Sequence, residues 1–226
     1  MNRTSSALAL FLALATGACA TPSAPERAAA ACEYAEDYGA TLTALANEID
    51  FTCETLGALR ANAVDPRGTN KETLETFERG VKNLAVQLER ARKDYAKMDA
   101  RAHAFLATWG TDTVTLRDGN LAREAETRRG TLQASFETLA REDLAVQQRV
   151  ERYRLELADL ATYLANDLSP RGFAGAQAAI ERAFQGGSSL RAELALLATK
   201  VEAVRAELEP LRGPGSTEPA ATAGAN

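Results

Sequence analysis

The sequence predicts an all-α protein, an elongated antiparallel four-helix bundle assembled from long helical hairpins. Its composition is the first indication, because the helix formers Ala, Leu, Glu and Arg are abundant whereas aromatic residues make up only 6% of the chain. The second is an apolar spacing that alternates between three and four residues, as coiled coils and long bundles require. The third is a set of turn signals between these apolar segments, without any run of β-branched residues that would predict a strand.

Four coiled-coil-like heptad seams divide the chain into four predicted helices. Each seam keeps one apolar stripe on the same face of a helix over many turns, so that the stripe can pack against a partner. The seams run over residues 38–59, 74–109, 132–164 and 173–208. The helices that they predict span residues 30–62, 70–116, 121–168 and 170–209, and together form one bundle domain over residues 30–209.

Turn and capping signals place the boundaries of the first two helices. Asp65 and Pro66, followed by Gly68, end the first helix. Thr69 with Glu72 has the spacing of a capping box and predicts the start of the second.

Similar signals bound the other two helices. The Asp-Gly-Asn turn at residues 118–120 separates the second helix from the third. Ser169 is the predicted N-cap of the fourth helix, with Pro170 at its first position, and Pro210 ends that helix. Glycines at 186 and 187 interrupt the helix formers, but the seam passes through Gly187 in phase. We therefore predict one continuous fourth helix that packs closely at this point.

The predicted lengths imply a projecting end. Short connections make consecutive helices antiparallel. The second and third helices, each about 47 residues or about 70 Å, are longer than the first. Their shared tip, residues 109–121, should therefore extend beyond the body, at the same end as the N-terminus.

The first residues resemble a bacterial export signal. Arg3 precedes an apolar run at residues 7–15, which is too short to span a bilayer, and small residues then lead to Cys19. This ending resembles a lipobox, which predicts a signal peptide at residues 1–18 and acylation of Cys19. Residues 18–20 also fit an ordinary signal peptidase site, so simple secretion is the alternative. A flexible linker at residues 19–29 is predicted to follow.

The destination follows from the same resemblance. In that class of lipoproteins Asp after the acylated cysteine is associated with inner-membrane retention, and this chain has Ala20 there. We therefore expect the periplasmic face of the outer membrane, or the periplasm or medium if Cys19 is not acylated. Residues 210–226 are rich in Pro, Gly, Ser, Thr and Ala and predict a disordered tail.

Two further cysteines, Cys32 and Cys53, lie in the first predicted helix. Their separation of 21 residues corresponds to about 32 Å along a helix, far beyond the reach of a disulfide bond. We expect either two buried free thiols or an intermolecular disulfide through one of them.

Two segments resemble an uncharacterised family of bacterial lipoproteins known as domain of unknown function 2959. One is Trp109 followed by the Thr-Arg-Arg run at residues 127–129 and by Leu132. The other is residues 163–169, which is similar to the family's aromatic-Leu-Lys-His-Asn-Leu-Asn segment, although Ala165 and Asn166 replace its Lys and His. The resemblance implies a long helical fold and an envelope location, and it implies no activity.

No catalytic, cofactor or metal site is predicted, so we expect a protein that is not an enzyme. His103 is the single histidine and has no potential ligand at metal-site spacing, which argues against a zinc or haem site. Asp143 falls on an apolar seam and predicts a buried polar layer, paired with an arginine across the bundle. Loss of Arg3 with the signal peptide changes the net charge from −5 to −6, which argues against nucleic acid as a partner.

The predicted tip is the candidate interaction site. Trp109 either caps the core at the end of the bundle or anchors the tip, with Val114, Leu116 and Arg117, at lipid headgroups or a membrane-bound partner. Residues 101–130 contain five arginines and four acidic residues, a net charge of +1 in an acidic protein.

These observations lead to three functional hypotheses. The first is a lipid-anchored envelope protein whose helical rod is a spacer or a docking scaffold for envelope proteins. The second is a soluble periplasmic chaperone-like protein that binds unfolded or apolar clients through exposed seams. The third is a self-assembling protein linked through a cysteine. Partner, biological process and oligomeric state, and whether the seams pack within or between chains, are left open by the sequence.

Overall fold

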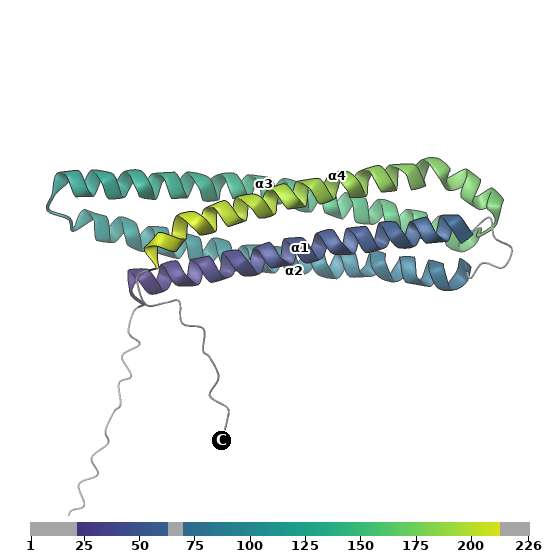
Figure 1. The fold of residues 1–226 in the computed structure, drawn as a ribbon, viewed down its shortest axis with the longest axis horizontal. Coiled ribbons are helices and arrows are strands. Elements are labelled where there is room, and N and C mark those ends of the chain that lie inside the picture. The colour runs from purple at the N-terminus through teal and green to yellow at the C-terminus, as the bar shows by residue number, and fades with distance from the viewer. Residues whose placement is uncertain (1–21, 63–69, 213–226) are drawn as a thin grey trace, which may run out of the picture.

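Four long α-helices form the structure, a computed structural model that describes residues 22–62 and 70–212 (Figure 1). The helices are α1 (Ala24–Asn62), α2 (Asn70–Val114), α3 (Gly119–Asn166) and α4 (Pro170–Leu208), and a short 3₁₀-helix, η1 (Glu209–Leu211), follows α4. No strand occurs in the described part of the chain. The structure confirms the predicted all-α class and places each helix boundary except the first within two residues of its predicted position.

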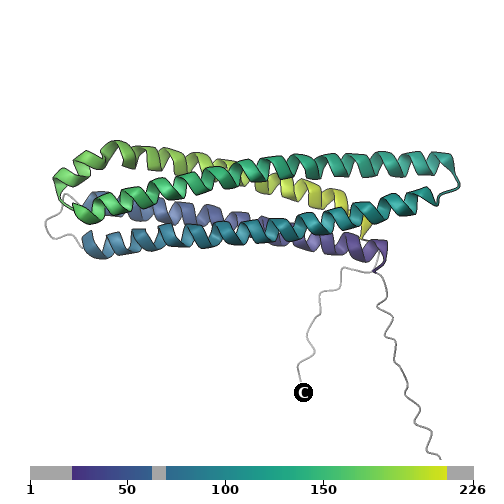
Figure 2. The same cartoon turned by 180° about the vertical axis from the view of Figure 1, so that it is seen from behind.

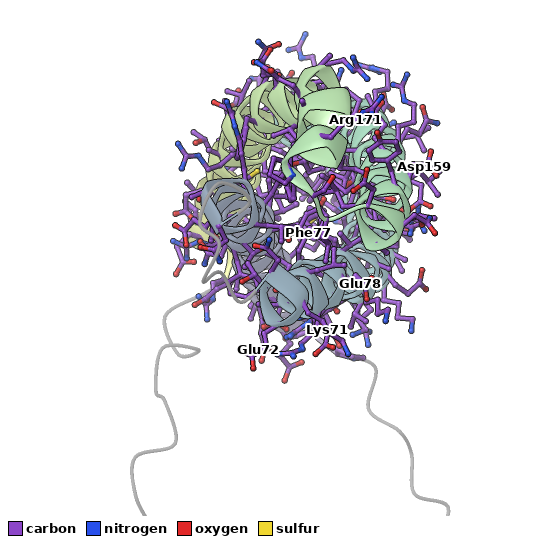
Figure 3. All side chains as sticks on the ribbon, turned by 90° about the vertical axis from the view of Figure 1, so that its right-hand side faces the viewer. Lys71, Glu72, Phe77, Glu78, Asp159 and Arg171 are labelled. Carbon is purple, nitrogen blue, oxygen red and sulfur yellow. The ribbon has the colours of Figure 1, made fainter. Side chains whose placement is uncertain are left out.

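The helices run antiparallel to their neighbours in the chain and close into a bundle. α1 packs against α2 and α4, and α3 packs against the same two helices, whereas the diagonal pairs meet only through side chains in the core (Figures 1 and 2). Seen along the bundle axis, the four helices surround one core, with Phe77 pointing inward and Lys71 and Glu72 on the outside (Figure 3).

The predicted seams form this core. Every seam residue of α1, α3 and α4 is buried, and in α2 only Tyr95 and Trp109 are half-buried. The four seams therefore pack against one another within a single chain. Burial of apolar surface contributes about 25 cal/mol per Å² and is the main stabilising interaction along the rod.

The predicted linker at residues 19–29 is wrong from residue 24 onward, because α1 begins there. The Ser23 backbone N–H donates to Glu26 Oε2 at 2.6 Å, and the Ser23 hydroxyl accepts from the Glu26 backbone N–H at 3.4 Å. This reciprocal pair is a capping box, and Pro25 suits the first turn because that turn needs no N–H donor there. Ala28 and Ala31 then extend the buried seam toward the N-terminus.

The structure describes the N-cap of α4 and the first residues of the predicted tail. The Ser169 hydroxyl caps α4 by accepting from the Gly172 backbone N–H at 3.2 Å, as predicted. Of the tail predicted to be disordered, residues 210–212 are described, and Leu211 packs against the core in η1. The signal peptide, Cys19, Thr69 and the rest of the tail lie outside the described residues.

α4 passes through Gly186 and Gly187 without a break, as predicted. A Cβ atom at position 187 would lie 2.6 Å from Cys53 Sγ and 2.7 Å from Tyr153 Oη. Real Cβ atoms do not approach other atoms this closely, so Gly187 allows α4 to pack directly against α1 and α3.

The two described cysteines are both free and lie within α1. Cys32 is buried near the carbonyl oxygen of Arg205, and burial raises its thiol pKa to about 11. Cys53 is half-buried, with Sγ 3.1 Å from Tyr153 Oη, and burial also raises its pKa. High thiol pKa values make both cysteines poor nucleophiles at neutral pH.

A buried polar layer is present at Asp143, but its partner differs from the predicted arginine. The Tyr38 hydroxyl of α1 donates to Asp143 Oδ1, and the Gln147 amide donates to Oδ2 at 2.6 Å. The Tyr38 ring contacts Tyr95 of α2 edge to face, with ring centroids 5.5 Å apart. A tyrosine satisfies a buried carboxyl without bringing a second charge out of water, which an arginine would require.

Replacing Asp143 with asparagine should change how stability depends on pH. Burial raises the pKa of the Asp143 carboxyl above its usual value of 3.8, although the hydrogen bonds from Tyr38 and Gln147 oppose this rise. Because the folded state holds the proton more tightly than the unfolded state, stability from this group is greatest below pH 3.8 and is lost as pH rises through the raised pKa. Asp143→Asn should therefore gain stability relative to the unmodified protein between about pH 4 and pH 7.

Urea denaturation of both proteins across this pH range measures the difference directly. All other carboxyl groups are common to the two proteins, so their titration cancels in the comparison. A difference in unfolding free energy that stays constant with pH would contradict the prediction.

Candidate functional site at the hairpin tip

The α2–α3 hairpin continues beyond the ends of the other two helices. The last turn of α4 lies beside Ser135, whose hydroxyl donates to Glu207 Oε1 at 3.3 Å. The first turns of α3, residues 119–131, therefore extend roughly 18 Å further. Figures 1 and 2 show the hairpin projecting past the start of α1 and the end of α4. The projection and its position at the N-terminal end of the bundle agree with the sequence prediction.

Side chains at this end lose their cover where α1 and α4 stop. Phe105 is still buried, and Trp109 is half-buried against it, with ring centroids 5.5 Å apart. Thr113 is the last buried residue of α2, and no residue from 114 to 131 is buried. The hairpin tip is therefore a pair of helices without the two partners that cover it elsewhere.

An open groove of about 460 Å³ occupies this position, between the hairpin and the ends of α1 and η1. Its lining is mainly apolar, with two carboxylates and one guanidinium. The lining residues are Ala24, Pro25, Phe105, Trp109, Asp112, Leu116, Leu121, Glu124, Ala125, Arg128 and Leu211. A second groove of about 400 Å³ shares Trp109 and Leu211 with the first and reaches Leu132 and Glu207.

The predicted tip residues lie together at this end. Val114 is 85% exposed and Leu116 is 42% exposed, and Arg117 is also exposed. Trp109 packs on Phe105 and also lines both grooves, so it caps the core and faces solvent at once. Leu121, 60% exposed, belongs to the same surface.

The turn between the helices holds these side chains outward. The backbone N–H groups of Thr115 and Leu116 donate to the carbonyls of Asp112 and Thr113, each at 3.1 Å. Asp118 then caps α3, because its Oδ1 accepts from the backbone N–H groups of residues 120 and 121 at 2.8 and 3.2 Å. These contacts fix the backbone of the turn that carries Val114 and Leu116.

The arginines of the tip are available to an external anion. Within the described residues, Arg117, Arg123 and Arg128 form no ion pair, and Arg123 donates only to the Asn120 side chain at 2.5 Å. Arg129 is different, because it pairs with Glu126 and lowers the pKa of that carboxyl. The Asp118 carboxylate is already engaged with backbone N–H groups. The turn therefore presents guanidinium groups beside exposed aliphatic side chains.

Potential metal ligands do not cluster in the described part of the chain. His103 is exposed, with Nε2 3.4 Å from Asp99 Oδ1 on the same helix. In residues 22–62 and 70–212, no three His, Cys, Asp or Glu side chains cluster closely enough to hold a metal ion. None of the described helices has an apolar stretch long enough to cross a membrane.

Comparisons of the chain with protein-family models, with curated proteins and with solved structures found no match. The resemblance to domain of unknown function 2959 therefore stays a prediction. Of its two segments, residues 163–169 form the end of α3 and the turn into α4, and Trp109 lies at the opposite end of the rod.

The sequence predicted the site residues at the end of α2 but not the groove residues that come from distant segments. Ala24, Pro25 and Leu211 line the groove but carry no signal of their own, since small and apolar residues are common at helix ends. Arg128 belongs to the Thr-Arg-Arg run that resembles the lipoprotein family, and the sequence did not indicate that it lines a groove. Leu121 marked the boundary of the predicted tip, and its exposure follows from the early end of α4.

Proposed function

We propose that this protein is a non-enzymatic, lipid-anchored protein of the bacterial cell envelope, in which the helical rod is a spacer and its projecting tip a docking surface. The lipobox-like sequence at Cys19 supports the anchor, and the resemblance to an envelope lipoprotein family agrees with it. The periplasmic face of the outer membrane is the proposed location. α2 and α3, with 45 and 48 residues, give the rod a length of about 70 Å.

The position of the start of α1 is the observation that best supports the proposal. The chain enters α1 at Ala24, which also lines the tip groove, so the segment that precedes it arrives at the projecting end of the rod. A lipid on Cys19 would hold that end at the membrane and direct the α1–α2 and α3–α4 connections into the periplasm. The rod would then separate its far end from the membrane by most of its length.

Burial of the seams counts against the chaperone-like alternative. That function needs an apolar seam exposed to clients, and the seams of all four helices are buried against one another within the chain. The tip groove is one place in the described chain where apolar surface stays accessible. The same burial leaves the seams unavailable for self-assembly.

Intact mass measurement of the mature protein, from membrane and soluble envelope fractions, tests the anchor. We expect a diacyl or triacyl mass increment on a chain that begins at Cys19, and its loss with release from the membrane in a Cys19→Ser variant. An unmodified chain that begins after Ala20 would overturn the lipid anchor and make the protein a free periplasmic or secreted one.

In-cell crosslinking tests the docking role separately. A crosslinker at Val114 should capture partners that are lost when Trp109 and Leu116 are replaced by alanine. Crosslinked products that do not change with these replacements would exclude the tip as the docking surface.

A further inference from the structure

We propose that the tip of the α2–α3 hairpin inserts into the interface of an anionic lipid bilayer. Val114, Leu116 and Leu121 would enter the boundary between headgroups and acyl chains, while Arg117 and Arg123 would lie among the lipid phosphates. The inference rests on the proposed function for the presence of a membrane, and it deepens that function by naming lipid as the surface that the tip contacts.

Exposure of aliphatic side chains is the first argument. Val114 is 85% exposed, the highest value among the large apolar residues that the structure leaves in water, and Leu121 is 60% exposed seven residues later. Together with Leu116 they place three exposed aliphatic side chains around the turn, whose backbone is held by hydrogen bonds. Exposed aliphatic side chains bordered by Trp and Arg suit a bilayer interface, where the apolar groups enter the acyl boundary and the guanidinium groups stay among the headgroups.

Charge is the second argument. The chain as a whole carries a net charge of −5, whereas residues 101–130 carry +1. Arg117 and Arg123 have no carboxylate partner in the described chain, and Asp118 beside them is engaged with backbone N–H groups. An anionic membrane repels the acidic shaft more strongly than this end, so electrostatics favours the rod with its tip toward the lipid.

The short distance between Cys19 and the hairpin tip is the third argument. From Trp109 to Val114, α2 advances roughly 8 Å toward the apex. Ala24 lines the tip groove. The five residues of chain that separate Cys19 from Ala24 can span at most roughly 17 Å. A lipid on Cys19 and an inserted tip can therefore occupy one membrane surface together, as two attachments that fix the rod upright.

Vesicle binding by the unacylated protein tests the inference. A chain that begins at residue 20 keeps every described residue, including the whole buried core, and cannot be acylated at Cys19. Trp109 is the single tryptophan, so its fluorescence reports on the tip alone. We expect flotation with vesicles of phosphatidylglycerol and phosphatidylethanolamine, accompanied by a blue shift of Trp109 emission, and weaker binding to phosphatidylcholine vesicles.

Substitutions at the tip should reduce this binding while circular dichroism shows an intact fold. Val114→Ser with Leu116→Ser should lower the partition coefficient about tenfold or more. Arg117→Gln and Arg123→Gln should each lower binding to the anionic vesicles about fivefold. Leu144→Ser with Leu196→Ser is the matched control, because these shaft leucines are 58% and 57% exposed, and it should leave binding unchanged.

Two results would overturn the inference. One is the absence of binding to either kind of vesicle. The other is an equal loss of binding in the tip and shaft variants. Because the chain in this experiment has no lipid, neither result affects the mass measurement that tests the anchor, and an unmodified Cys19 would leave the vesicle result standing.

Discussion

Replacing Tyr38 with alanine is expected to lower the free energy of unfolding by about 3–5 kcal/mol. Tyr38 is fully buried and is among the largest side chains of the core. Its ring packs edge to face on Tyr95, and its hydroxyl donates to Asp143. Alanine would leave a cavity in the middle of the rod and would also leave the Asp143 carboxyl with Gln147 as its remaining partner, so both losses add to the cost.

Urea denaturation at neutral pH measures this loss, and two further variants interpret it. Tyr38→Phe removes the hydrogen bond and keeps the ring, so it should lose about 1–3 kcal/mol. Tyr163→Ala is the matched control, because Tyr163 is 47% exposed on the same bundle, and it should lose about 1 kcal/mol or less. Equal losses at positions 38 and 163 would show that the polar layer is not in the core.

Leucine at position 187 should destabilise the protein by about 3 kcal/mol, whereas the same change at position 130 should stabilise it slightly. At Gly187 even a Cβ would lie 2.6 Å from Cys53 Sγ and 2.7 Å from Tyr153 Oη, so a leucine must push α4 away from its neighbours. At Gly130 a Cβ meets nothing within 4 Å. There the gain in helix propensity, up to about 1 kcal/mol, is unopposed.

Thermal and urea denaturation of the two leucine variants compare these sites. Because both glycines lie inside long helices, propensity favours leucine equally and the difference reports interhelical packing. If Gly187→Leu were as stable as Gly130→Leu, the close approach of α4 to α1 and α3 would be wrong.

Most of the fold could be predicted because its signals are local. Heptad seams identify the helices and the residues that each one buries, and Ser169, Pro170 and Asp118 mark helix ends through contacts within three residues. The start of α1 was missed because Pro25 occurs in a Pro-Ser-Ala-Pro stretch that is typical of linkers. The capping contacts between Ser23 and Glu26 favour the helix there.

Contacts between distant residues could not be predicted in the same way. Asp143 was recognisable as a polar residue on an apolar seam, but its partner depends on which side chain of α1 faces it at the same height. Tyr38 lies 105 residues away, and the relative shift of two helices by a single turn would replace it with another residue. The tip groove depends in the same way on where α1 begins and α4 ends.

Local sequence patterns predicted the number of helices, their antiparallel order, the seams that form the core and the projection of the α2–α3 tip. These properties follow from periodicity, helix length and short connections, which act along the chain. The folded arrangement of the helices was needed to show that the seams pack within one chain, that Tyr38 hydrogen-bonds to Asp143, and that Ala24, Pro25 and Leu211 complete a groove beside Trp109. The physical reason is that packing between helices depends on their axial register and on side chains from several of them at once, and no local pattern records either.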